Sequence, residues 1–164
     1  MEDYLIESVT AFSELNSGAT YLVLFHVDKQ PPHLGIIHQN EYFSLRYDKL
    51  QMGIDPQTIL KTVETKKIPT LLFEVKLESA EAIQDIFKAY QSIEKISCLF
   101  PIREFFYPDF YEDIQLVFDL LDKLKADQRI IATYSLNLNL ISNQYKLKKY
   151  SVQDVQKEIK RLQE

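Results

Sequence analysis

The side chains most suited to chemistry are three histidines and one cysteine. His26, His33 and His38 all lie between residues 18 and 45, and Cys98 is the single cysteine of the 164-residue chain. A thiolate beside an imidazole is the pairing that nucleophilic cysteine chemistry requires. Without that adjacency, the same residues are ordinary core or loop residues. The elements that position these side chains therefore decide what they do.

The histidines are not spaced to share a metal ion. If the first two strands pair so that His26 lies opposite Leu34, then His26 and His38 share a face but lie about 13 Å apart. His33 then points to the other face, and no nearby acidic residue completes a ligand set. We expect no metal and no cofactor, and we expect His26 to lie in or near the core.

Composition predicts one ordinary globular domain over residues 1–164. The chain is 46% hydrophobic and 26% charged, and it contains ten Phe and ten Tyr residues, which argues against disorder. A single cysteine indicates a reducing compartment, and the cytoplasm is the simplest setting. The acidic N-terminus is unlike a targeting peptide, and no apolar run has the length of a membrane span.

Charge is distributed unevenly along the chain. The net charge is −5, but residues 141–164 carry six basic and three acidic side chains. An acidic protein is a poor general ligand for nucleic acid, since phosphate binding needs clustered Lys and Arg. The positive charge of residues 141–164 is explained by basic side chains on an edge strand and on the solvated face of a last helix. A dedicated anion site there is the alternative.

Hydrophobic periodicity and capping signals predict an α+β fold with a mixed, partly antiparallel sheet, an N-terminal β-meander and packed helices. Asp55 followed by Pro56 is a strong helix start, and Asp109 with Glu112 fits a capping box. Helices are expected over residues 3–15, from 55, over 79–90, from the capping box at 109 through about 124, and from 151. Strands are expected over 20–27, 33–38, 41–47, 68–77, 129–140 and 144–150, with a short one near 96–98.

The meander also resembles a known family. Gly18–Phe25, then His33-Leu34-Gly35-Ile36-Ile37, then Glu41–Leu45 are similar in layout to the circularly permuted papain-like hydrolases related to the NlpC/P60 group. The resemblance covers about thirty residues. It implies a Cys–His thiol hydrolase acting on an amide or ester, with His33 as general base and Cys98 as nucleophile. Ser44 would orient the imidazole.

The surroundings of Cys98 depart from that family, in which the cysteine begins a well-formed helix. Here the cysteine lies within Ile96–Pro101, and the residues favour a small buried side chain at the end of a short strand. Alternatively, Pro101 belongs to the first turn of a helix carrying Ile102 to Phe106, which would restore the family geometry.

Half of the residues in the segment 100–111 are aromatic. Core packing explains some of these rings, and rings left on the surface beside an arginine would suit a protein-binding patch or a self-association interface. Ion-pair or cation–π contacts within the segment are the alternative role of the arginine. The candidate binding residues are Phe100, Arg103, Phe105, Phe106, Tyr107, Phe110 and Tyr111.

Other enzyme signatures are missing from the sequence. With three glycines, neither a dinucleotide-binding nor a phosphate-binding loop is present. There is also no nucleophile elbow, zinc-protease or deaminase motif. We therefore expect an accessory or regulatory domain that acts through protein contact, without nucleic acid or membrane, and the permuted papain-like hydrolase is the alternative.

Overall fold

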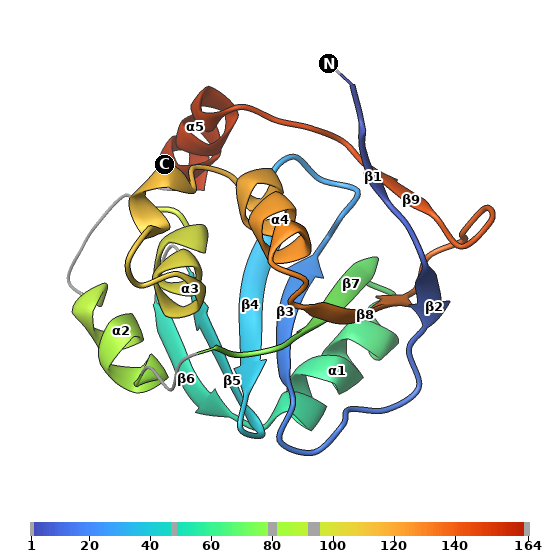
Figure 1. The fold of residues 1–164 in the computed structure, drawn as a ribbon, viewed down its shortest axis with the longest axis horizontal. Helices are drawn as coiled ribbons and strands as arrows, with labels where there is room; N and C mark the ends of the chain where they lie inside the picture. Colours follow the sequence, from blue (N-terminus) through green and yellow to red (C-terminus); the bar gives the residue numbers. More distant parts are fainter. Residues whose placement is uncertain (1, 47–48, 79–81, 92–95, 163–164) are drawn as a thin grey trace.

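A mixed seven-stranded sheet organises the fold, in the order β2-β8-β7-β3-β4-β5-β6, and a two-stranded pair β1-β9 lies beside it (Figure 1). The computed structural model describes residues 2–46, 49–78, 82–91 and 96–162. Strands β2 and β8 are parallel, and all other neighbours are antiparallel. The strands are β1 Tyr4–Ile6, β2 Val9–Ala11, β3 Thr20–Phe25, β4 His33–His38, β5 Glu41–Leu45, β6 Leu50–Ile54, β7 Thr70–Val75, β8 Ile130–Leu136 and β9 Tyr145–Leu147.

Helices cover both faces of the sheet, which confirms the predicted α+β class. In Figure 1, α3 and α4 lie in front of the sheet, α1 lies behind it, and α5 lies at the end near the β3–β4 connection. The helices are α1 Pro56–Thr65, α2 Ile83–Ala89, α3 Leu99–Phe106, α4 Val117–Ala126 and α5 Val152–Leu162, with a 3₁₀ turn η1 at Tyr111–Asp113. Ser79 and Glu81, expected at the start of α2, lie outside the described residues.

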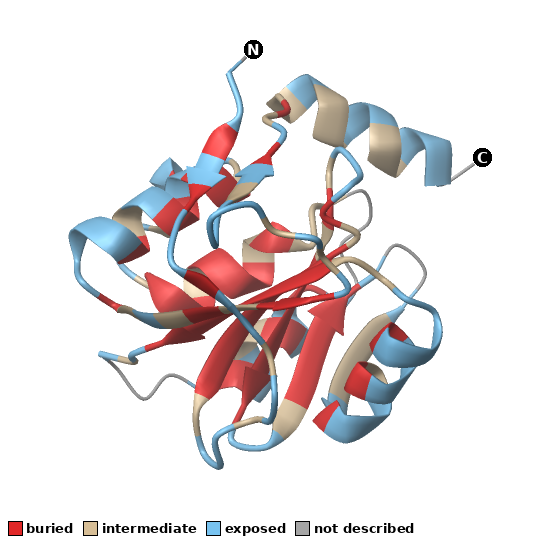
Figure 2. Ribbon diagram, turned by 90° about the vertical axis from the view of Figure 1, so that its right-hand side faces the viewer, coloured by how far each residue is buried: buried red, intermediate tan, exposed pale blue. Residues whose placement is uncertain are grey.

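The core has two parts because strands β3, β4 and β7 are buried on both faces (Figure 2). Tyr21, Val23 and Phe25 of β3 face α1. Leu22 and Leu24, which alternate with them along the strand, face α3 and α4. Two-faced burial explains why β3 is apolar at every position rather than alternating.

The helix predicted over residues 3–15 is wrong. Tyr4 and Ile6 are buried while Leu5 is 40% exposed, which is the alternation of strand β1. Ser8 then adopts a positive φ of 55°, a conformation that ends any helix, before β2 begins at Val9. The apolar spacing fitted a helix as well as two short strands, and the strand partners β8 and β9 decide the outcome.

Two other element starts differ from the prediction. The expected strand near Cys98 is instead the start of α3, and Pro101 lies in its first turn, as the alternative interpretation required. Helix α4 begins after Leu116 rather than at Asp109, because the Asp119 carboxylate accepts the Leu116 amide at 2.9 Å.

Gly35 of β4 is required by its cross-strand neighbour Tyr42 of β5. A Cβ at position 35 would lie 2.6 Å from a ring carbon of Tyr42, which is itself buried. We predict that Gly35→Ala lowers the free energy of unfolding by about 1–3 kcal/mol, measured by urea denaturation. The penalty should shrink in a Tyr42→Leu background. An equal penalty in both backgrounds would show that ring contact is not the cause.

Candidate functional site

A cavity of about 710 Å³ lies between α5, the second half of α1 and the end of the sheet where β4 begins. Its walls are mainly apolar, with Ile59 and Val63 of α1 on one side and Val155 and Ile159 of α5 on another. Polar and charged side chains also line it, among them His33, Gln51 and Glu158. A concave volume that combines apolar surface with polar groups is a usual form of a ligand site.

Helix α5 covers this cavity without filling it. The helix is amphipathic, yet none of its described residues is buried, and Leu162 is 43% exposed. Figure 2 shows α5 standing apart from the strands, with partly buried residues along its inner side. Its start is held by the Ser151 hydroxyl, which donates to Asp154 at 3.0 Å, and by the Gln30 amide, which donates to the Lys149 carbonyl at 3.0 Å.

His33 is the first residue of β4 and lines the cavity. It pairs with Phe25, and the two rings stack with centroids 5.8 Å apart. Its Nε2 atom is buried and has no hydrogen-bond partner among the described residues. A buried polar nitrogen without a partner carries an energetic cost.

Burial keeps the His33 imidazole neutral at pH 7. The pKa of His33 is lowered to about 4, mainly by desolvation and to a smaller extent by electrostatic interaction with Arg46 and His26. His26 is not the strand residue that was expected, because Leu34 pairs with Leu24 rather than with His26 and β3 ends at Phe25. It follows β3 with a positive φ of 54°, and burial lowers its pKa as well.

The β4–β5 ladder opens beside His33. The last residue pair at this end of the ladder is Ile36 with Phe43, although β4 begins earlier, at His33, and β5 continues to Leu45. The Tyr42 ring lies over Gly35 at this opening, and burial raises the pKa of its hydroxyl to about 12. The hydroxyl therefore stays protonated.

Ser44 takes part in a polar chain rather than orienting His33. Its hydroxyl donates to the Gln51 Oε1 atom at 2.9 Å, and it also hydrogen-bonds Tyr42. Tyr42 and Gln51 line the cavity, but Ser44 is not among its lining residues.

Cys98 is at the N-cap of α3 and lines the same cavity as His33. Burial raises the pKa of its thiol, while hydrogen bonds with the backbone of Leu34 and Leu99 oppose that effect. Since Leu34 directly follows His33, the thiol lies at the open end of β4. The thiol's hydrogen bonds go to the backbone and to Ser97, and none within the described part of the chain joins it to the His33 imidazole. The structure thus places both residues in one cavity without coupling them.

The aromatic segment 100–111 mostly belongs to the core. Phe105, Phe106 and Tyr107 are buried, and the Tyr107 hydroxyl donates to Asp127 at 2.8 Å. Phe105 packs edge-on against His38 with centroids 5.1 Å apart. These three aromatic rings are therefore not available to a surface partner.

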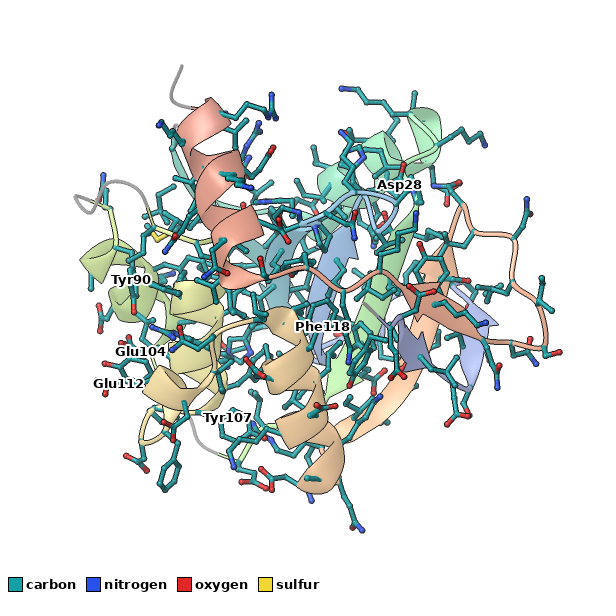
Figure 3. The ribbon with its side chains drawn as sticks, turned by 90° about the horizontal axis from the view of Figure 1, so that it is seen from above. Asp28, Tyr90, Glu104, Tyr107, Glu112 and Phe118 are labelled. Carbon is teal, nitrogen blue, oxygen red and sulfur yellow. The ribbon has the colours of Figure 1, made fainter. Side chains whose placement is uncertain are left out.

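The rest of the segment surrounds Arg103. The guanidinium is buried, donates to the Ile114 carbonyl at 2.6 Å and lies 3.8 Å from the centre of the Phe100 ring. Tyr111 is half-buried against the same guanidinium, and Phe110 alone of the seven candidate binding residues is largely exposed, at 61%. Internal cation–π contact thus accounts for Arg103. Figure 3 shows Glu104 and Glu112 close together, on the opposite side of the view from Asp28 of the β3–β4 connection.

Sequence reasoning found His33 and Cys98 but missed the rest of the cavity. The apolar face of α5, formed by Val152, Val155, Ile159 and Leu162, was visible as a helical period. What the sequence could not show is that this face covers an unfilled volume. Among the described residues, no group of three or more His, Cys, Asp or Glu is placed to hold a metal ion, and no helix is long and apolar enough to cross a membrane.

Comparison with known protein families, curated proteins and solved structures finds no match to this chain. The papain-like resemblance therefore stays a prediction that rests on the residues of the meander.

The buried imidazole should make the protein sensitive to acid. Because the folded pKa of His33 is about 4 and the unfolded value is about 6.5, the unfolded chain binds the extra proton between these values. The free energy of unfolding should fall by about 2–3 kcal/mol from this residue as the pH drops from 6.5 to 4. Urea denaturation across this range should show a shallower slope for His33→Gln than for wild type. An equal slope in His33→Gln and in wild type would contradict the assignment.

Proposed function

We propose that this protein is a binding module that holds a largely apolar organic ligand in the cavity under α5. The observation that carries the proposal is a cavity of about 710 Å³ whose surface is more apolar than polar and which α5 covers without inserting a buried side chain. The expected role in protein contact has less support, because one of the seven candidate residues of the aromatic segment is largely exposed. The single cysteine suits action in a reducing compartment, such as the cytoplasm.

The protonation states support binding more than catalysis. Burial raises the pKa of the Cys98 thiol and lowers that of His33, so both side chains are neutral at pH 7. A thiolate nucleophile requires the opposite, a thiol acidified by an adjacent imidazolium. Neutral groups are instead those that an apolar cavity accommodates.

The cavity should bind a neutral fluorescent probe such as N-phenyl-1-naphthylamine. We predict enhanced emission with wild-type protein and its loss in Ile159→Trp, because the indole fills the space between α5 and α1. Ile131→Trp is the matched control: Ile131 is 61% exposed on β8 and does not line the cavity. Undiminished binding by Ile159→Trp would place the probe elsewhere and remove the main support for a ligand site.

A Cys–His hydrolase is the second candidate function. The observation that favours it is the position of Cys98 at the N-cap of α3. Its thiol is hydrogen-bonded to the backbone of Leu34, the residue that follows His33. In such an enzyme the Cys98 sulfur attacks the carbonyl carbon of an ester or amide as His33 takes the thiol proton. The proton then passes to the departing alcohol or amine, and water releases the acyl group as a carboxylic acid.

Alkylation of Cys98 by iodoacetamide separates the two functions, and no other cysteine complicates the measurement. For a binding module we predict slow alkylation whose rate rises only above pH 9, since burial raises the thiol pKa above that ordinary value. The rate should be unchanged in His33→Ala. Rapid alkylation near pH 6 that disappears in His33→Ala would instead identify the hydrolase.

A further inference from the structure

We propose that the ligand carries a neutral carbonyl oxygen, as in a ketone, ester or amide, which accepts a hydrogen bond from the Tyr150 hydroxyl while its apolar body lies between α5 and α1. The inference rests on the proposed binding function and names the chemical class that the cavity accepts. It draws on three features of Tyr150: a hydroxyl without a partner, a position on the cavity wall and a carboxylate nearby.

Tyr150 is buried, yet its hydroxyl has no hydrogen-bond partner among the described residues. The side chain is 5% exposed, and its ring packs against Phe118 of α4 with centroids 4.9 Å apart. The residue directly precedes Ser151, whose hydroxyl accepts the Asp154 amide at the start of α5. A buried tyrosine hydroxyl usually finds a partner, because an unmade hydrogen bond carries an energetic cost.

The other buried tyrosines that the structure describes each have a hydroxyl partner. In chain order, these partners are Asp122 for Tyr4, the backbone amide of Asn16 for Tyr21, Ser44 for Tyr42, Glu104 for Tyr90 and Asp127 for Tyr107. Tyr150 therefore lacks what its counterparts have, and a ligand could supply it.

The Tyr150 hydroxyl is open to the cavity that its side chain lines. The unpartnered side-chain atoms that the described part of the chain encloses completely are Nε2 of His33 and Nε of Arg103, and the Tyr150 oxygen is not one of them. A ligand in the cavity can therefore reach this oxygen, whereas it cannot reach the enclosed nitrogen of His33.

The surroundings of the hydroxyl favour a neutral acceptor over an anion. The Asp119 carboxylate of α4 acts electrostatically on Tyr150, and its Oδ2 atom already accepts the backbone amides of Gln115 and Leu116. This carboxylate would repel a negatively charged ligand. Burial raises the pKa of the Tyr150 hydroxyl, so the hydroxyl stays protonated and can donate. A carbonyl oxygen accepts such a hydrogen bond without carrying a charge.

The rest of the ligand must be largely apolar. Beyond Tyr150 the lining includes Val155 and Ile159 of α5 and, across the cavity, Ile59 and Val63 of α1. None of the described α5 residues is buried by the protein itself. Because Tyr150 lies at the start of α5, an apolar body anchored there would extend along the inner face of the helix and remove it from water.

Displacement of the neutral probe by three matched naphthalene derivatives tests the inference. The first, 2-acetylnaphthalene, has a carbonyl group; 2-ethylnaphthalene has a methylene group in its place; 2-naphthoate has a charged carboxylate. We expect Tyr150→Phe to weaken binding of the acetyl compound about fivefold and to leave that of the ethyl compound within about twofold, because one neutral hydrogen bond is lost. With wild type, 2-naphthoate should bind most weakly of the three.

Tyr107→Phe is the matched control, because the Tyr107 hydroxyl donates to Asp127 and the residue does not line the cavity. It should change neither affinity. The two variants should also differ in stability. Tyr150→Phe should unfold at the same urea concentration as wild type, since no hydrogen bond within the protein is lost, and Tyr107→Phe should unfold at a lower one.

Equal weakening of the acetyl and ethyl compounds by Tyr150→Phe, or no weakening of either, would overturn the inference. Tightest binding of 2-naphthoate would do the same, and so would a clear loss of stability in Tyr150→Phe, which would reveal a partner for the hydroxyl within the protein. If the neutral probe still binds in these cases, the proposed function stands. Failure of the probe to bind the cavity at all would overturn the proposed function itself.

Discussion

The open end of the β4–β5 ladder is the constraint on which the rest of the site depends. Pairing stops at Ile36 and Phe43, and the Tyr42 ring occupies the space over Gly35 where another side chain would stand. The backbone of Leu34 is consequently available to the thiol of Cys98 at the start of α3. A glycine in the middle of a buried strand thus has a positional reason, the close approach of an aromatic ring.

Helix α5 explains why the opening leads into a cavity rather than into packed core. Each of the other α-helices has at least two buried apolar side chains, as Leu60 and Val63 are in α1. The described residues of α5 insert none, and its contacts at the start are polar ones through Ser151 and Lys149. An amphipathic helix with its apolar face half-covered is less stably attached than its neighbours, so ligand binding and helix attachment should be coupled.

The parts of the fold that the sequence predicted are those fixed by local chemistry. Asp55 caps α1 through the Gln57 amide, and the meander from β3 to β5 follows from its continuous apolar strands. The prediction for residues 3–15 was wrong because the same apolar spacing suits a helix and two short strands. The partners of those strands, β8 and β9, lie more than a hundred residues away in the sequence. The β3–β4 register was missed by two positions, which moved His26 out of the strand. Long-range pairing and the unfilled space under α5 cannot be read from local patterns.

The protons at Cys98 and His33 connect the binding and catalytic interpretations of this site. Burial is the largest cause of both pKa shifts and keeps both groups uncharged. Cysteine chemistry would require the opposite state, a thiolate favoured by an adjacent imidazolium. The resting proton positions therefore support the proposed binding role more than the hydrolase.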